Sequence, residues 1–163
     1  MAVIRVEKNK NYTVKDCVLF LWVTIPCLLE GLHVLQAWGF TYKTIAFVWV
    51  KQNRKADSLF WGMGYWTRSN VEFCILATKG HPRRQDAGVH QVVMSHIEEH
   101  SKKPQEVRDR ITQLMGDVPR IELFARQKVP GWDAWGNEVK SDISMEGSDV
   151  NGVCAGSEGS DAS

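Results

Sequence analysis

CVLFLWV, residues 17–23, is an unbroken run of seven apolar residues. Strands covered on both faces have this pattern, and such strands are typical of parallel sheets. The run therefore predicts a central strand with a parallel neighbour. The wider apolar segment, residues 17–29, is broken by Pro26 and is shorter than the roughly 20 residues that span a bilayer. We expect a buried element of a protein that does not enter membranes.

The segments that follow alternate between helical and strand-like patterns. Apolar residues recur at helical spacing over residues 25–38, and residues 104–115 form a second expected helix, with Pro104 in its first turn and Gly116 as its stop. Strand-like runs lie at residues 43–51, 71–78, 90–95 and 121–124. This alternation indicates an α/β sheet. The connection between residues 51 and 71 is too long for a simple turn and is a candidate working loop.

The composition indicates one globular domain followed by a polar tail. The chain has 163 residues, of which 44% are hydrophobic. Residues 140–163 are rich in Ser and Gly and hold five acidic residues against one lysine, so we expect them to be disordered. No secretory leader is recognisable, and the four cysteines have no zinc or CxxC spacing. We expect a cytoplasmic protein with free thiols and without a metal site.

Two groups of residues could contact nucleic acid. Basic side chains follow two of the expected strands, namely Lys79, Arg83 and Arg84 after one and Lys102 after the other. Such positions can meet phosphates, although a solvated loop has the same composition. Of the seven tryptophans, Trp22, Trp38 and Trp49 lie in regular elements and are expected in the core. The other four lie in loops, where aromatic rings can stack on bases: Trp61, Trp66, Trp132 and Trp135.

Five segments carry a resemblance to a known family. They are DCVLFLWVT, LQAWGFTYKTIAFVWVK, LFWGMGYWTRSNVEFCILATKG, HSKKPQEVRDRI and PRIELFARQKVPGWDAWGNE, in this order from about Lys15 to Val139. Together they resemble the MT-A-type N6-adenine methyltransferases. This is the family of the eukaryotic mRNA adenosine methyltransferase, and the chain is most like its phage and prophage DNA-modifying members. The order and number of the segments make the resemblance specific.

The resemblance implies a Rossmann-like, S-adenosylmethionine-dependent methyltransferase fold that transfers a methyl group to N6 of adenine. It assigns cofactor contacts to Lys103, Arg126 and Asn137, and also to Lys128 and Glu138, which stand where family members carry other polar residues. Cationic side chains can hold a carboxylate, and an amide can bond ribose and adenine edges. The resemblance also places Glu72 and Trp66 at the pocket for the target base. Salt bridges or helix caps are the alternative roles for these residues.

One family motif is missing from these residues. The family carries Asp-Pro-Pro-Trp before the segment that starts here at Lys15, and this sequence has no two adjacent prolines. In the family, the motif accepts hydrogen bonds from the adenine amino group and stacks on the flipped base. We therefore expect a fold that is incomplete at its N-terminus, no catalytic residue in this chain, and no methylation by the chain alone.

The expected organisation has three parts. Residues 1–14 resemble the opening of phage replication-initiation proteins and form a foreign or replaced segment, residues 15–139 form the methyltransferase-like domain, and residues 140–163 form the acidic tail. Residues 1–14 offer a short apolar strand, at Val3, Ile4 and Val6, that could fill the place of the missing one. An unfilled place would expose Leu21 and Trp22 and favour association.

Three hypotheses follow for the function. The first is an adenine-N6 methyltransferase family member that binds adenine-containing DNA, with RNA as the alternative, and is inactive alone. The second is a non-catalytic nucleic-acid-binding or scaffolding subunit of a methyltransferase complex. The third is a gene remnant that folds poorly because a central strand is lost. The first two imply a partner, either a second methyltransferase subunit or a second copy of this chain.

Overall fold

A computed structural model describes residues 2–5, 16–99 and 102–143. The expected boundary between residues 14 and 15 lies outside these residues, as does the tail from residue 144 onward. In the described part of the tail, the Asp142 backbone N–H donates to the carbonyl of Ala134 at 2.8 Å. Ordered contacts therefore continue to Asp142, three residues beyond the end of the fold expected at Val139.

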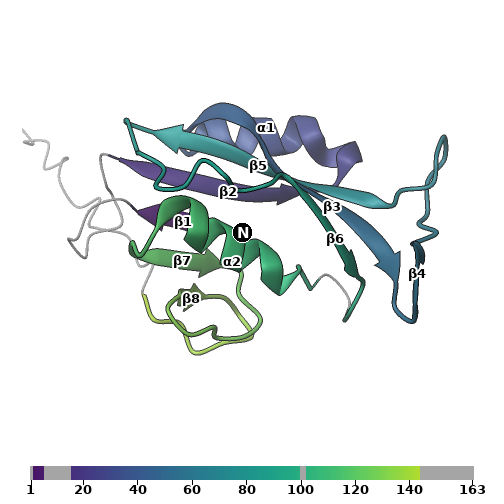
Figure 1. The fold of residues 1–163 in the computed structure, drawn as a ribbon. Helices are drawn as coiled ribbons and strands as arrows, with labels where there is room; N and C mark the ends of the chain where they lie inside the picture. Colours follow the sequence, from purple (N-terminus) through teal and green to yellow (C-terminus); the bar gives the residue numbers. More distant parts are fainter. Residues whose placement is uncertain (1, 6–15, 100–101, 144–163) are drawn as a thin grey trace, which may run out of the picture.

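The strands of the described residues form a single mixed sheet (Figure 1). Its order is β4-β3-β5-β2-β1-β7-β8, with β6 paired to β3. Most neighbours are antiparallel, and only the β3–β6 and β7–β8 pairs are parallel. The strands are β1 (Ala2–Arg5), β2 (Cys17–Val23), β3 (Thr41–Asn53), β4 (Ala56–Leu59), β5 (Val71–Lys79), β6 (Val92–His96), β7 (Arg120–Leu123) and β8 (Asp133–Trp135).

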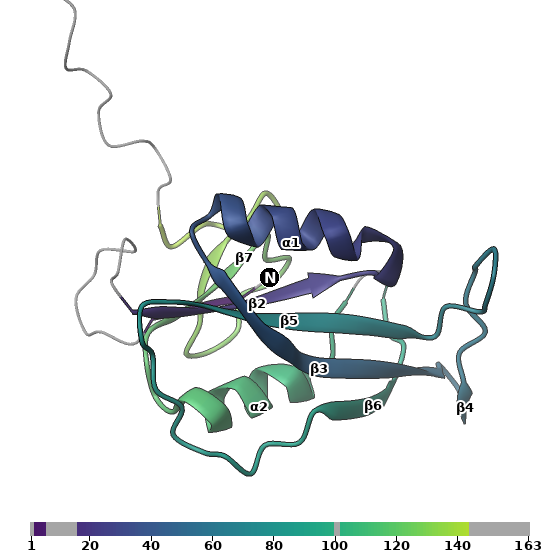
Figure 2. The ribbon, with the colours of Figure 1, turned by 90° about the horizontal axis from the view of Figure 1, so that it is seen from above.

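One helix covers each face of the sheet (Figure 2). The helix α1 (Leu28–Ala37) follows a 3-10 turn, η1 (Ile25–Cys27), and α2 (Gln105–Met115) lies on the opposite side. The expected helix over residues 25–38 therefore begins with a tighter turn at Pro26. Gly31 allows close packing, since a Cβ there would lie 2.5 Å from Val23 Cγ1. The three layers confirm the α/β class.

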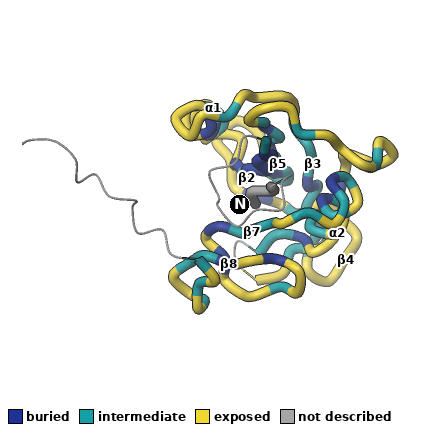
Figure 3. Tube along the Cα trace, turned by 90° about the vertical axis from the view of Figure 1, so that its left-hand side faces the viewer, coloured by how far each residue is buried: buried dark blue, intermediate teal, exposed yellow. Residues whose placement is uncertain are grey.

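Side chains of β2 alternate between two cores. Val18 and Phe20 pack with α2, whereas Leu19, Leu21 and Val23 pack under α1. Figure 3 shows buried stretches of the sheet strands between the largely exposed tubes of the outer elements. The expectation of a parallel neighbour is wrong, because β1 and β5 both run antiparallel to β2. Burial on both faces arises from the two helix layers, and an apolar run carries no signal for strand direction.

The place beside β2 is filled by the N-terminal residues. The strand β1 lies between β2 and β7, with Ala2 opposite both Phe20 and Glu122. It pairs with residues 17–20 of β2 only. The short strand expected near Val3 and Ile4 is therefore present. Its sequence, AVIR, carries no carboxylate.

The burial of two tryptophans differs from the expectation. Trp49 is buried, as expected, but Trp38 is 41% exposed at the end of α1, so its expected place in the core is wrong. Trp132 is buried with the α2 core although the sequence suggests a loop ring available for stacking. Among the described helices, none has the length and apolar character needed to cross a membrane.

Candidate functional site

Several strand ends meet at one end of the sheet. The pairing of Val23 with Phe73 and of Trp49 with Glu72 brings together the end of β2, the start of β5 and the second half of β3. Lys103 reaches the same place from the segment that precedes α2. We call the group of Glu72, Lys51 and Lys103 with the rings of Trp22 and Trp49 the charged centre.

Glu72 is the acid of the charged centre, and it is 8% exposed. Its Oε1 accepts a hydrogen bond from Lys51 Nζ at 2.6 Å, and its Oε2 accepts one from Lys103 Nζ. Burial acts to raise the pKa of Glu72, but the hydrogen bonds and charges of Lys103 and Lys51 outweigh it and hold the pKa below its usual value. The carboxylate is therefore ionised, and both of its oxygens are engaged.

The two tryptophans hold the lysines in place. Lys103 Nζ lies 5.4 Å from the centre of the Trp22 ring and 5.9 Å from that of Trp49. Lys51 Nζ lies 5.1 Å from the Trp49 ring, and the two rings meet edge to face at 6.3 Å. Cation–π contacts of this length favour the ammonium form and restrict the side chains. The charged centre is thus a fixed cluster.

A cleft of about 440 Å³ opens between the start of α2 and the end of β7. Each of its four cations has an acidic partner. Arg108 binds Glu122 through two hydrogen bonds of 2.9 Å, and Arg126 Nε lies 3.0 Å from Glu138 Oε1. The lining residues are Glu99, Lys102, Lys103, Arg108, Glu122, Phe124, Arg126, Gln127 and Glu138. We call this space the β7 cleft.

Phe124 stands at the mouth of the β7 cleft in an unusual conformation. Its φ is 58°, its side chain is 64% exposed, and its ring lies 5.4 Å from that of Trp135. A left-handed backbone at a bulky residue is strained, and such strain clusters at functional sites. The sequence predicted only the last residue of a strand here. Gly136 packs closely against the next residue, since a Cβ there would lie 2.4 Å from the carbonyl oxygen of Ala125.

The structure brings together three of the five expected cofactor residues. Lys103, Arg126 and Glu138 all line the β7 cleft. Lys128 instead forms an ion pair with Asp142, beside β8. Asn137 is exposed and is not among the residues that line the cleft.

The two residues expected around the target base lie in different environments. Glu72 is buried in the charged centre, whereas Trp66 is 90% exposed in the loop between β4 and β5. Trp66 packs edge to face on Tyr65 at 5.3 Å, and Arg68 lies 5.6 Å over the ring of Trp61. This loop presents a group of exposed aromatic rings, which the tryptophan content of the sequence indicated.

The expected nucleic-acid contacts separate into two groups. Lys79 ends β5, and Arg83 and Arg84 follow it in an exposed segment. Lys102 lies next to Lys103 of the charged centre, in the segment before α2, and pairs with Glu98. Because the charged centre contacts the first residues of β5, these groups lie toward opposite ends of that strand. The Arg108–Glu122 pair was not expected, since nothing in the sequence connects a helix residue with a strand residue so far along the chain.

Comparison with known proteins identifies the relatives of this chain. The family model described as MT-A70 matches residues 5–138. The type II methyltransferase M.MunI of Mycoplasma sp is 39% identical over 131 residues, which are 79% of this chain and 53% of that protein. The human N(6)-adenosine-methyltransferase catalytic subunit METTL3 is 31% identical over 128 residues, 76% of this chain and 22% of that protein. An MT-A70-like N(6)-adenosine-methyltransferase of Arabidopsis thaliana is also 31% identical, over 76% of this chain and 18% of that protein.

The extent of these matches decides what they establish. They cover most of this chain, but the chain spans about half the length of M.MunI and about a fifth of the other two relatives. A family model that matches so much of the chain, together with the resemblance of the five sequence segments, leads to one conclusion. The chain belongs to MT-A70, the family of S-adenosylmethionine-dependent N6-adenine methyltransferases.

Proposed function

We propose that this chain binds S-adenosylmethionine in the β7 cleft, within a Rossmann-like domain, and contributes the cofactor-holding part of an adenine-N6 methyltransferase that acts on DNA. The observation that carries the proposal is the cleft itself. Lys103, Arg126 and Glu138, which the family resemblance assigns to the cofactor, come from separate segments and line one space at the end of β7. Open α/β sheets place their ligands beyond such strand ends.

The residues of the cleft fit the chemistry of this cofactor. A volume of about 440 Å³ is within the range of small-molecule sites. Arg126 and Lys103 suit the carboxylate of an amino-acid moiety, and Glu138 can accept hydrogen bonds from ribose hydroxyls. The exposed Phe124 ring offers a face for stacking. When bound, S-adenosylmethionine supplies an electrophilic methyl group.

We also propose that the 163 residues do not methylate adenine by themselves. Presenting the amino group of adenine requires hydrogen-bond acceptors at the charged end of the sheet. Glu72 is the one buried acidic residue among the described ranges, and two lysines engage both its oxygens. The strand beside β2, AVIR, offers no carboxylate. The acceptor-binding residues would then lie outside these 163 residues, for example in a second methyltransferase subunit.

The comparisons favour DNA as the substrate. The identity with M.MunI, 39%, exceeds the 31% identity with the relatives that are named for adenosine, a ribonucleoside. The exposed rings of Trp61, Tyr65 and Trp66 with nearby Arg68 can stack on unpaired bases of either nucleic acid and support nucleic-acid binding in general.

Calorimetric titration with S-adenosylmethionine tests the cofactor proposal. Arg126→Ala removes a cation from the cleft and should weaken binding by about tenfold, the effect of one charge-assisted hydrogen bond. Arg83→Ala is the matched control, because Arg83 is exposed and does not line the cleft. Equal affinity of the wild type and both variants would contradict the cofactor site, as would no binding by the wild type.

A methyl-transfer assay on adenine-containing DNA tests the second part. We expect no turnover with the purified chain and turnover when an active family member is added as a partner. Sustained turnover by the chain alone would contradict the proposed inactivity.

The alternative is a non-catalytic nucleic-acid-binding subunit, and the exposed aromatic loop between β4 and β5 favours it. Under this alternative the chain binds DNA without binding S-adenosylmethionine. Its DNA affinity falls as salt rises, because counterions are released from the phosphates on binding. DNA affinity that is independent of salt would contradict this alternative.

A further inference from the structure

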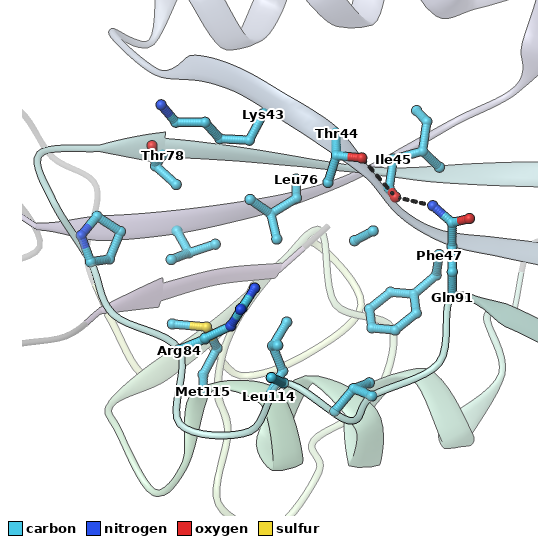
Figure 4. A pocket seen from close by; sticks show the side chains of 15 residues that line it. Lys43, Thr44, Ile45, Phe47, Leu76, Thr78, Arg84, Gln91, Leu114 and Met115 are labelled. Carbon is cyan, nitrogen blue, oxygen red and sulfur yellow. Dashed lines mark hydrogen bonds between the residues drawn. The ribbon is translucent and has the colours of Figure 1, made fainter.

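A second and larger cavity lies on the α2 side of the sheet (Figure 4). Its volume is about 540 Å³, and its walls come from β3, the second half of β5, residues 82–91 and the end of α2. Leu76, Phe47 and Leu114 contribute apolar surface, and Thr78 and Gln91 contribute polar groups. We call this space the β3 groove.

Two irregularities in β3 form one wall of the groove. The pairing of β3 with β5 shifts register between Tyr42 and Thr44 and again between Ile45 and Phe47. The five consecutive residues 43–47 all line the groove. A regular strand would turn Ala46 and Phe47 to opposite faces, but both pack on the α2 side, whereas the Ile45 side chain packs under α1. Bulges of this kind redirect side chains and are frequent beside functional sites.

The two cations of the β3 groove have no acidic partner among the residues that the structure describes. Neither Lys43 nor Arg84 forms an ion pair with a residue of the described ranges, and no acidic residue lines the groove. In the β7 cleft, by contrast, all four cations have acidic partners. Asp86 is the acid nearest to Arg84 in the sequence, but its carboxylate accepts hydrogen bonds from the Gly88 N–H and from Gln113. The groove therefore carries net positive charge.

The walls of the groove are held in place before any ligand arrives. The Gln85 N–H donates to the carbonyl of Leu114 at 2.8 Å and fastens the segment to α2. At the other end of the segment, Gln91 Nε2 donates to the Ile45 carbonyl at 2.5 Å, and the Val48 N–H donates to the Gln91 carbonyl at 3.0 Å. A site that is already ordered loses little conformational entropy on binding.

We propose that the β3 groove binds a nucleoside phosphate, with the base against Leu76 and Leu114 and the phosphate between Lys43 and Arg84. Figure 4 shows Lys43 extending from β3 and Arg84 from the segment opposite, with Leu76 pointing into the space between them. An apolar body with one anionic group is the ligand that an apolar floor and two free cations complement. Thr78 and Gln91 can bond the sugar or the base edges.

This site is distinct from the cofactor and acceptor sites. Thr78 lines the β3 groove, whereas Glu72 belongs to the charged centre, and the six residue steps between them along β5 span about 20 Å. The end of the groove near Thr78 therefore supplies an anchoring contact for a nucleotide away from the charged centre. The nucleotide could be free or part of a nucleic-acid strand, and both sources offer the same chemistry.

Binding of thymidine ligands to the full chain tests the proposal. We would titrate thymidine monophosphate by calorimetry and a fluorescein-labelled oligothymidylate of eight residues by anisotropy, both with saturating S-adenosylhomocysteine to occupy the β7 cleft. Unphosphorylated thymidine measures the contribution of the phosphate. The double variant Lys43→Glu/Arg84→Glu is compared with Lys55→Glu/Lys140→Glu, which makes the same charge change at exposed positions outside the groove.

We expect the Lys43→Glu/Arg84→Glu variant to bind at least about tenfold more weakly and the control variant to stay within about twofold of the wild type. Loss of binding for both ligands supports a groove open to free nucleotides, and loss for the oligonucleotide alone supports a nucleotide held within a strand. No binding by the wild type, or equal losses in the two double variants, would overturn the proposal. Thermal unfolding of each variant checks that the exposed substitutions leave the fold intact.

Discussion

Replacing Glu72 with glutamine tests the charged centre, on which the packing at this end of the sheet depends. The substitution keeps the shape of the side chain and removes its charge. Lys51 and Lys103 would then lie beside two tryptophan rings without an anion. Their side chains are 17% and 25% exposed, so water reaches them only in part.

The expected loss of unfolding free energy follows from this partial burial. Removing one partner of a fully buried ion pair costs about 3–5 kcal/mol. Because both lysines keep some contact with water, we expect Glu72→Gln to cost about 2–3 kcal/mol at pH 7. Glu138→Gln is the matched control, since Glu138 and Arg126 are 60% and 54% exposed. Surface pairs of this kind contribute at most about 1 kcal/mol.

The effect of Glu72→Gln should depend on pH in a defined direction. The pKa of Glu72 is lower in the folded protein than its ordinary value of 4.5. Its contribution to stability is therefore complete above the unfolded-state pKa and is lost as the pH falls through the folded-state pKa. The stability difference between wild type and variant should be largest at pH 6–8 and should shrink below about pH 4.5.

Urea denaturation at a series of pH values measures this difference, with tryptophan fluorescence as the signal. Two results would refute the reasoning. One is a cost of Glu72→Gln no greater than that of Glu138→Gln. The other is a stability difference between wild type and Glu72→Gln that stays constant down to pH 3.

Three further predictions follow from the packing, the backbone and the cysteines. Gly31→Ala should destabilise the protein by about 1–3 kcal/mol in urea denaturation, because the added methyl group would lie 2.5 Å from Val23 Cγ1, and a cost below that range would show that α1 can shift. Phe124→Gly should raise the free energy of unfolding, because glycine adopts a φ of 58° without strain, and it should lower the affinity for S-adenosylmethionine. A decrease in both quantities would argue against stored strain. Burial raises the pKa of Cys74 to about 12, so iodoacetamide should modify exposed Cys27 in the native protein and Cys74 only after unfolding, and mass spectrometry of labelled peptides would detect the opposite order.

The sequence predicted the bounds of some helices and strands but missed other strands. The helix α2 and the strand β2 have the expected bounds to within a residue, because an apolar run and a proline-started helix are local signals. The long connection after β3 contains the short strand β4, which its polar composition, ADSL, did not predict. The strand β8 is held by β7 and by Asp142, so its formation depends on residues elsewhere in the chain. Such elements have no local signature to read.

By itself, the sequence determined the α/β class, the family and three residues of the β7 cleft, since apolar periodicity and the five family segments are properties of the linear chain. The tertiary structure decided that β2 has antiparallel neighbours, that Glu72 is bound by two lysines, and that Lys43 and Arg84 face one groove without acidic partners. These features depend on which strand ends meet and in which register. Hydrogen bonds and ion pairs between distant residues form only after the sheet has assembled, so their partners cannot be read from the order of residues along the chain.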